Sequence, residues 1–376
     1  MTHRQPAGDN RQRPLKLAIV AGEASGDLHA ASVLSELKKL APGIETFGIG
    51  GDLLAAQGMN VLHHAREMGI VGLFNVLRHL GMFRRIFREM IDRLAAEKPD
   101  AVLLVDYPDF NLRLAKKCKA MGLRVIYFIS PQVWAWRRGR VKEIAKNVDR
   151  MIVIFPFERD FYEAHNVPVT YVGHPLIDQT AAFRREPSKP GVLRIALMPG
   201  SRRREVDDLL PPMLDALAIL QADRRVDPFI IQAPTIDRRE LERIAGETIP
   251  IVSEDRGAAL ASADVAISSS GTATLESAIL GTPVVVLYKL GAATYLLAKR
   301  LVRLKHFSLV NIVAGREVVP ELLQSDVTGE KIAARVRTLA DSPQQVQSDL
   351  LEVKRRLGEP GASRRAAEAI MSELSQ

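Results

Sequence analysis

The sequence predicts an α/β protein with two Rossmann-like domains, each built on a doubly wound parallel sheet, that face one another across a cleft. Two observations support this prediction. Short apolar runs rich in β-branched residues alternate with helix-length amphipathic segments along the chain. The chain also has 376 residues, more than one hydrophobic core usually covers, and its alternation breaks near the middle.

The first half of the chain carries the strands of one predicted sheet. These strands are expected at 17–21, 46–49, 101–105, 125–129, 151–155 and 170–172. Open parallel sheets bind ligands beyond the carboxyl ends of their strands. The loops that follow these runs are therefore where a site is expected.

A break in the pattern separates the two predicted domains. The segment 182–191, AFRREPSKPG, gathers proline, glycine and charge, which is typical of a linker. It divides an amino-terminal domain, 15–181, from a carboxy-terminal domain, 192–357. The strands of the second sheet are expected at 194–198, 229–232, 249–252, 265–268 and 284–287.

The two ends of the chain are predicted separately. Residues 1–14 are polar and charged without an apolar stretch, so they are expected to form a disordered tail and not a signal peptide. Residues 358–376 begin with a Gly-Glu-Pro-Gly break, and a helical pattern follows from 363 to 374. This C-terminal helix could pack on either domain, including back on the amino-terminal one.

Composition limits the classes of function. The net charge of +8 indicates an acidic partner, which nucleic acid, anionic lipid or a phosphorylated substrate would all satisfy. The arginines fall in loops between strands and helices and form no stripe with interleaved aromatics, which argues against nucleic acid. The single cysteine, Cys118, fits a reducing compartment. No apolar run is long enough to span a bilayer, so any membrane contact is expected to be peripheral.

The turn after the first strand is a candidate binding loop. Gly22, Ser25 and Gly26 lie in the sequence GEASGD, which opens a helix. A helix N-terminus presents N–H groups and partial positive charge, which suit an anion or a sugar hydroxyl. A simple helix cap is an equally good interpretation of this turn alone.

A carboxylate follows the strand at 101–105. Asp106 opens the sequence DYPDFN and is expected at the carboxyl edge of the sheet, where it could accept a proton from a sugar hydroxyl. Asp109 is best interpreted as a helix cap, with Asn111 as the rival capping residue. Position alone leaves a structural role for Asp106 equally open.

Two loops of the second half favour a phosphate ligand. PGSRRRE follows a strand, and in it Ser201 can cap a helix while Arg202 can donate two hydrogen bonds to a phosphate. The loop SSSGTATLE also lies between strand and helix. Its small residues expose backbone N–H groups that would suit a diphosphate, and an acidic side chain stands where a ribose hydroxyl could reach it. The candidate residues of this loop are Gly271, Thr272, Thr274 and Glu276.

The segment 68–91 has more apolar residues than one core face needs. One helical stripe is predicted to be core, and a second set mixes apolar residues with arginine, which suits insertion into an anionic lipid interface. The residues expected to face the membrane are Val71, Phe74, Arg78, Met82, Arg85 and Ile86. No histidine or cysteine cluster has metal-ligand spacing and no D-x-D motif occurs, so neither a metal nor a cofactor is implied.

Several motifs along the chain carry a resemblance to a known family. They are GEASGD, DYPDFN, SPQVWAWR, PFE, VGHPL, PGSR, SGTATLE and NIVAGRE. From about residue 15 to the C-terminus they resemble the lipid-A-disaccharide synthase family. The resemblance implies a glycosyltransferase-B fold and an inverting transfer. The implied donor is UDP-2,3-diacylglucosamine, the acceptor is 2,3-diacylglucosamine 1-phosphate, and the products are a β-1,6-linked disaccharide and UDP.

The resemblance also assigns expected roles to residues. Asp106 corresponds to the catalytic carboxylate and Arg202 to the arginine of P-G-S-R, while Gly271, Thr272 and Glu276 fall on the nucleotide loop. Asn311 and Arg316 lie in the family's N-x-x-A-G-R-E segment and are expected to bind substrate or nucleotide. The expected location is cytoplasmic, peripheral on the inner face of the inner membrane. A UDP-sugar epimerase of the same fold is the alternative function.

Overall fold

The computed structural model describes residues 13–69, 76–135, 138–185, 189–291 and 305–375. The chain divides into two compact units, described one by one below. Unit 1 contains residues up to Val172 together with those from Gly361 onward, and unit 2 runs from Gly173 to Pro360. The division after Val172 comes earlier in the chain than the segment 182–191 that the composition suggested as a linker.

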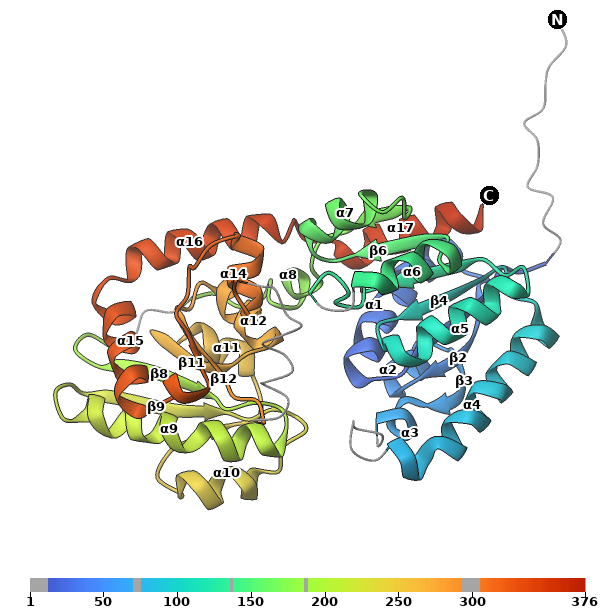
Figure 1. The fold of residues 1–376 in the computed structure, drawn as a ribbon. Coiled ribbons are helices and arrows are strands. Elements are labelled where there is room, and N and C mark those ends of the chain that lie inside the picture. Colours follow the sequence, from blue (N-terminus) through green and yellow to red (C-terminus); the bar gives the residue numbers. More distant parts are fainter. Residues whose placement is uncertain (1–12, 70–75, 136–137, 186–188, 292–304, 376) are drawn as a thin grey trace, which may run out of the picture. The chain divides into compact units, whose positions relative to one another are not determined.

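Unit 1 is a parallel sheet covered by helices (Figure 1). Its strand order is β3-β2-β1-β4-β5-β6-β7. The strands are β1 (Lys16–Ala21), β2 (Glu45–Gly50), β3 (Asn60–His64), β4 (Ala101–Val105), β5 (Val125–Phe128), β6 (Arg150–Val153) and β7 (Val169–Tyr171). The helices are α1 (Ala24–Leu40), α2 (Asp52–Ala56), α3 (Ala65–Gly69), α4 (Val76–Glu97), α5 (Pro108–Ala120), α6 (Val141–Asn147), α7 (Pro156–Glu163) and α17 (Ala362–Leu374), with a 3-10 helix η1 (Arg138–Arg140).

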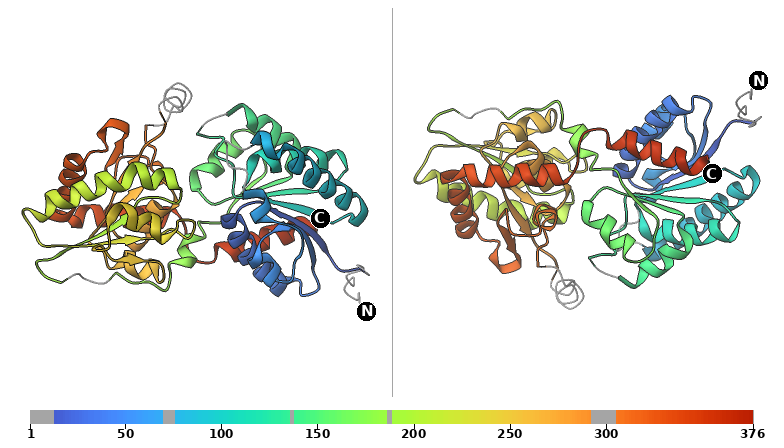
Figure 2. Two further views of the ribbon diagram at one scale, coloured as in Figure 1. Left: turned by 90° about the horizontal axis from the view of Figure 1, so that it is seen from below. Right: turned by 90° about the horizontal axis from the view of Figure 1, so that it is seen from above.

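The central strands of unit 1 are apolar on both faces because helices cover both. Ala18 and Val20 of β1 belong to a core cluster that also contains Ile86 of α4 and Leu114 of α5. Since side chains alternate along a strand, the other residues of β1 point to the opposite face. The last helix, α17, packs against α1, and Figure 2 shows it ending at the C-terminus beside that helix.

The sheet of unit 1 changes direction between β1 and β4, which are neighbours in the sheet but not in the chain. These two strands end together, because Ala21 is the register partner of Val105. Gly22 and Asp106 therefore leave the sheet side by side. This is the switch point where open parallel sheets bind their ligands.

Unit 2 is a second parallel sheet, with strand order β10-β9-β8-β11-β12-β13. Its strands are β8 (Leu193–Met198), β9 (Val226–Ile231), β10 (Ile251–Val252), β11 (Val265–Ser269), β12 (Val284–Tyr288) and β13 (Glu321–Leu323). Its helices are α8 (Leu176–Gln179), α9 (Arg203–Gln221), α10 (Arg238–Ala245), α11 (Arg256–Ala261), α12 (Thr272–Leu280), α14 (Leu309–Ala314), α15 (Gly329–Asp341) and α16 (Pro343–Arg356), with a 3-10 helix η2 (Gln324–Asp326). The switch point lies between β8 and β11, where Met198 pairs with Ser268.

The prediction of two doubly wound α/β domains is confirmed. Two edge strands, β3 and β13, were not expected from the sequence, because β3 (NVLHH) holds only two apolar residues and β13 (ELL) is only three residues long. Among the described residues no helix has both the length and the apolar character needed to cross a membrane.

Asp27 of the GEASGD turn is a structural residue. It is buried in α1, and its carboxylate accepts hydrogen bonds from the backbone N–H groups of Gly51, Leu53 and Leu54 at 2.7, 3.0 and 3.2 Å. These are N-terminal donors of α2, which a side-chain acceptor normally satisfies. Asp27 thus fastens α2 to α1.

Replacing this carboxylate should destabilise unit 1. We expect Asp27→Ala to lower the free energy of unfolding by about 2–3 kcal/mol, because it leaves buried N–H donors without an acceptor. Asp237→Ala is the matched control, since Asp237 caps α10 from an exposed position and accepts from the N–H of Arg239. Urea denaturation should show a loss of only about 0.5–1 kcal/mol for that control. Equal losses would contradict the structural role of Asp27.

Candidate functional site

Asp106 lies in a tight turn at the carboxyl edge of the unit 1 sheet. Asp106 and Tyr107 both have left-handed backbone conformations, with φ of 47° and 48°. Such angles are uncommon for residues with a side chain and cost roughly 1–2 kcal/mol each. The ring of Tyr107 lies so close to Gly22 that a Cβ there would be 2.6 Å from it. Gly22 is therefore required by this packing.

The carboxyl group of Asp106 has an unusual environment. Burial, and next the negative charge of Glu23, raise its pKa to about 6, against a smaller opposing effect of a hydrogen bond from the Tyr107 backbone. A carboxylate with a pKa near 6 is ionised at neutral pH and is a stronger base than an ordinary aspartate. The position and chemistry of Asp106 suit a general base.

Glu23 is a residue that the sequence reasoning did not select. It is exposed at the N-cap of α1, directly after Gly22, and its charge acts on both Asp106 and Tyr107. The sequence signal for Glu23 was its position as an acidic residue directly after β1, the strand beside β4 in the sheet. Of the other expected residues in this turn, Ser25 is exposed, whereas Gly26 is buried and packs against Ala21 and Val105.

In unit 2, the loop after β8 donates hydrogen bonds to a carboxylate of the protein itself, that of Glu205. Ser201 N donates to Glu205 Oε2 at 3.0 Å, and an Arg202 guanidinium nitrogen donates to Glu205 Oε1 at 2.9 Å. Arg202 is the N-cap residue of α9, so Ser201 does not take the capping position that the sequence suggested. The Arg202 side chain is 80% exposed, so it can turn toward a ligand.

The geometry around Gly200 fixes this arrangement. Gly200 has φ of 129°, and a Cβ on it would lie 2.4 Å from Glu205 Oε2. Thr235 Oγ1 also donates to the Ser201 carbonyl oxygen at 2.6 Å. The N–H group and the guanidinium that could bind a phosphate are thus ordered in advance by a carboxylate of the same helix.

The loop after β11 opens at the N-terminus of α12. Gly271 is its N-cap, with open space around the position of a Cβ, and Thr272 is exposed in the first turn. Glu276 is half-buried, and burial raises the pKa of its carboxyl group against the opposing charge of Arg256. Thr274 is different: its side chain is fully buried and its hydroxyl donates to the Gly271 carbonyl oxygen at 2.7 Å. The Thr274 side chain therefore serves the first turn of α12, and ligand binding by Thr274 stays a prediction.

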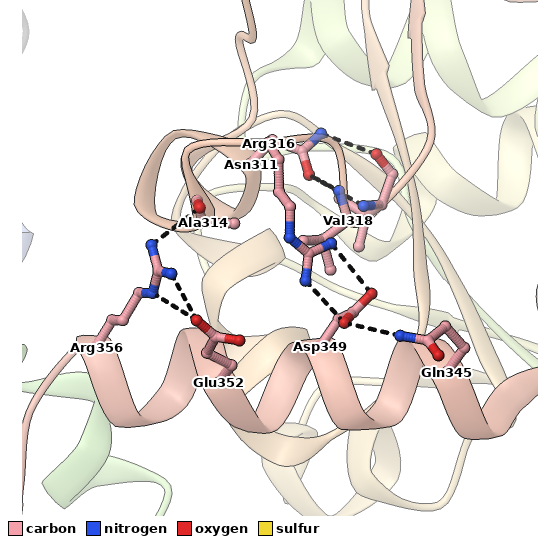
Figure 3. Close-up of polar contacts among 9 residues, drawn as sticks. Asn311, Ala314, Arg316, Val318, Gln345, Asp349, Glu352 and Arg356 are labelled. Atoms are coloured by element: carbon pink, nitrogen blue, oxygen red, sulfur yellow. Dashed lines mark hydrogen bonds and ion pairs between the residues drawn. The ribbon is translucent and has the colours of Figure 1, made fainter.

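Asn311 is a structural residue of α14 and not an available ligand (Figure 3). It is fully buried, and its Oδ1 accepts from the N–H groups of Val318 and Val319 at 2.7 and 3.0 Å. Its Nδ2 donates to the carbonyl oxygen of Val319 and to Glu321 Oε1, both at 2.8 Å. The amide has no bonding capacity left over. This corrects the expectation that Asn311 contacts the substrate.

Asn311 nevertheless acts on the loop near Gly271. The carboxylate of Glu321, which Asn311 holds, accepts hydrogen bonds from the N–H groups of Phe307 and Ser308 at 3.2 and 2.8 Å. Ser270 Oγ in turn donates to the Phe307 carbonyl oxygen at 3.5 Å. Asn311 therefore orders the segment that borders the candidate nucleotide loop.

Arg316 forms a two-point ion pair with Asp349 of α16 (Figure 3). Its two terminal nitrogens lie 2.8 and 3.3 Å from the Asp349 carboxylate oxygens, and the Arg316 side chain is half-exposed. Arg356 is also anchored, by an ion pair with Glu352 and a 2.9 Å hydrogen bond to the carbonyl oxygen of Ala314. These contacts fasten the end of α14 to α16.

The expected membrane-facing residues are only partly described. Val71 and Phe74 lie outside the described residues, as does the side chain of Arg78. Arg85 is exposed on α4, and Met82 is partly buried against the unit 1 core. Ile86 is fully buried in that core, so the expectation that it faces a membrane was wrong. It lies on the same helical stripe as Met90 and Leu94, which are also buried.

The two residues of the NIVAGRE segment should differ in their effect on stability. We expect Asn311→Ala to lower the free energy of unfolding by roughly 2–4 kcal/mol, because buried backbone donors and Glu321 lose their partners. Arg316→Gln breaks an exposed ion pair and should cost about 0–1 kcal/mol. Thermal or urea unfolding measures both, and an Asn311→Ala variant as stable as Arg316→Gln would contradict the structural role of Asn311.

Comparison with solved structures shows the fold. The glycotransferase of kitacinnamycin has a TM-score of 0.65 and 17% sequence identity, covering 96% of this chain and 100% of its own. A putative UDP-N-acetylglucosamine 2-epimerase from Listeria monocytogenes also has a TM-score of 0.65, with 15% identity over 96% of this chain and 97% of its own. The chain thus has the architecture shared by glycosyltransferases and epimerases of the glycosyltransferase-B fold.

Comparison of sequences identifies the family as well as the fold. A protein of Myxococcus xanthus called lipid-A-disaccharide synthase is 43% identical over 375 residues, covering 96% of this chain and 98% of the relative. A protein of the same name from Anaeromyxobacter dehalogenans is 45% identical over 374 residues, covering 96% and 97%. The family model described as lipid-A-disaccharide synthetase matches residues 17–373. The chain therefore belongs to the lipid-A-disaccharide synthase family.

Proposed function

We propose that this protein is a hexosyltransferase that makes the lipid A disaccharide. It would transfer 2,3-diacylglucosamine from UDP-2,3-diacylglucosamine to the 6-hydroxyl of 2,3-diacylglucosamine 1-phosphate. The products would be a β-1,6-linked disaccharide and UDP. The observation that carries this proposal is family membership over almost the whole chain, with relatives of that name at more than 40% identity.

Asp106 would act as the base of the transfer. Its carboxylate takes the proton of the acceptor's 6-hydroxyl while that oxygen bonds to the anomeric carbon of the donor. The bond from the anomeric carbon to the diphosphate breaks on the opposite face, which gives inversion, and its electrons leave with UDP. A positioned base contributes about 10²–10⁴ in rate. The pKa of about 6 supports this role because the ionised form prevails at neutral pH.

Unit 2 would bind the nucleotide part of the donor. Arg202 and the N–H groups of the first turn of α12 are suited to stabilise the negative charge that grows on the diphosphate. In this proposal the diphosphate displaces Glu205 from Arg202 and takes over its hydrogen bond. Glu276 would contact the ribose, whose hydroxyls a carboxylate can accept from.

Membrane contact is part of the proposal because both substrates carry acyl chains. The protein would bind peripherally to the inner face of the inner membrane. The described part of α4 offers three exposed arginines, Arg84, Arg85 and Arg88, that could interact with anionic lipid. The opposite side of this helix is anchored in the core through Ile86 and Met90.

The alternative of an epimerase is not favoured. The likeness to epimerases comes from structures with less than 20% sequence identity and concerns the fold alone. Product analysis separates the two reactions. Incubation with the acylated UDP-sugar and the acylated sugar phosphate, followed by mass spectrometry, should yield a disaccharide and free UDP. An isomerised monosaccharide derivative, or no product, would contradict the proposal.

The role of Asp106 as the base can be tested by replacing its carboxylate with an amide. We expect Asp106→Asn to reduce kcat by about 10²–10⁴ because the amide cannot accept the proton. UDP affinity, measured by calorimetry, should stay unchanged. Asp109→Asn is the matched control, since Asp109 is an exposed residue of the same motif that pairs with Arg140 at 3.1 Å. Normal turnover in Asp106→Asn would exclude Asp106 as the base.

The proposed membrane-binding surface on α4 can be tested by removing its positive charges. Replacing Arg84, Arg85 and Arg88 by glutamine removes three positive charges that are each worth about 1 kcal/mol near an anionic membrane. Affinity for vesicles containing phosphatidylglycerol should then fall on the order of a hundredfold. The same substitutions at Arg238, Arg239 and Arg243 of α10 change the net charge equally and serve as control. Equal losses in both variants would show a general charge effect and contradict a surface on α4.

A further inference from the structure

The main-chain carbonyl oxygen of Asp106 is held by two buried side chains from different elements. Tyr127 of β5 donates its hydroxyl to this oxygen at 2.6 Å, and Asn111 of α5 donates from Nδ2 at 2.8 Å. The backbone N–H of Asp106 donates to the Phe128 carbonyl oxygen at 3.0 Å. Both main-chain polar groups of this residue are thus fixed by hydrogen bonds.

Tyr127 is suited to this task because its hydroxyl keeps its proton. The residue is fully buried in the unit 1 core. Burial, and then the negative charge of Asp106, hold the pKa of the hydroxyl well above its usual value. The hydroxyl therefore stays protonated near neutral pH. Its hydrogen bond to the Asp106 carbonyl oxygen is not lost by ionisation.

Asn111 is kept at a cost to stability. Its Nδ2 also faces the carbonyl oxygens of Val20 and Val105, at 3.4 and 3.2 Å, where β1 and β4 end. Its Oδ1 is buried without a hydrogen-bond partner among the described residues, which costs about 1–3 kcal/mol. The reversed amide would point its oxygen at three carbonyl oxygens, so only this orientation is possible. A leucine of similar size would avoid this cost, which argues that the donation to Asp106 is useful.

The conformation of the turn explains why two donors are needed. Asp106 and Tyr107 both adopt left-handed conformations that residues with a side chain disfavour. A turn of this kind persists only when the surrounding structure holds it, and such turns are concentrated at functional sites. The direction of the Asp106 carboxylate depends on these backbone angles.

We propose that Tyr127 and Asn111 are positioning residues of the transfer reaction, which fix the Asp106 carboxylate by holding its main-chain carbonyl oxygen. This proposal rests on the role of Asp106 in the proposed function. Neither side chain touches the substrate. They act by keeping the base in one position and by keeping water away from it.

The test compares two tyrosines that differ in what their hydroxyls hold. Tyr127→Phe removes the hydroxyl that contacts Asp106. Tyr162→Phe removes an equally buried hydroxyl of unit 1, which is hydrogen-bonded to Ser130 Oγ at 2.7 Å. We expect kcat to fall about tenfold in Tyr127→Phe, with an unchanged KM for the donor, and to stay within about twofold in Tyr162→Phe. Both variants should lose similar amounts of thermal stability.

The pH dependence gives a second readout that a loss of stability would not change. Only the ionised carboxylate accepts a proton, so kcat/KM should fall as the pH drops through the pKa of Asp106. The charged groups acting on the turn are Glu23 at α1, Asp109 on α5 and Arg140 at η1, and these stay in place in both variants. Loosening the turn admits water and lowers the pKa, so the acid limb should move to lower pH by roughly one unit in Tyr127→Phe only.

Asn111→Leu provides a second variant. Asn111 and Tyr127 donate to the same oxygen, so the double variant should lose less activity than the product of the two single losses. Equal kcat and equal acid limbs in Tyr127→Phe and Tyr162→Phe would overturn the proposal, even if Asn111→Leu does not fold. Asp106→Asn run in parallel separates the two hypotheses: an active Asp106→Asn refutes the base, whereas an inactive one with a normal Tyr127→Phe refutes only the positioning.

Discussion

In each unit, two parallel strands end within one residue of each other where the sheet changes direction, and the proposed site depends on this constraint. In unit 1 the pairing of Ala21 with Val105 brings Gly22, Glu23 and Asp106 to one edge. In unit 2 the pairing of Met198 with Ser268 does the same for the loops at Gly200 and Gly271. A parallel sheet must place its crossovers on its faces, so these edges stay open to a ligand.

Buried and partly buried polar side chains order the loops at both edges. Asp27 holds α2, Asn311 and Glu321 hold the segment next to Ser270, and Glu205 holds Ser201 and Arg202. Glu158 does the same beneath the loop after β5, where it accepts from the indole of Trp134 at 3.1 Å. In each case a side chain fixes the backbone around it, but a ligand of Arg202 has to replace the hydrogen bond that Glu205 accepts from it.

The sequence predicted the architecture and the strand-end loops because hydrophobic periodicity reports local structure. The sequence could not show which groups each polar side chain contacts in the folded protein. Asn311 and Asp106 both occur in polar motifs, yet the Asn311 amide is hydrogen-bonded to the backbone near Val318, whereas the Asp106 carboxyl group is distinguished by a raised pKa. Ile86 was wrongly assigned to the membrane because an apolar helical stripe does not by itself show whether it faces the core or a membrane. Tyr127 was not selected because its contact with Asp106 depends on tertiary structure alone.

The turn at Asp106 keeps a carboxyl group with a raised pKa at the edge of the unit 1 sheet. Carbon-13 NMR of protein labelled at aspartate carboxyls measures this property directly, and the signal of Asp106 is identified by its absence from Asp106→Asn. We expect this signal to titrate with a midpoint near pH 6. A midpoint near the ordinary value of 3.8 would show that the turn does not raise the pKa of Asp106.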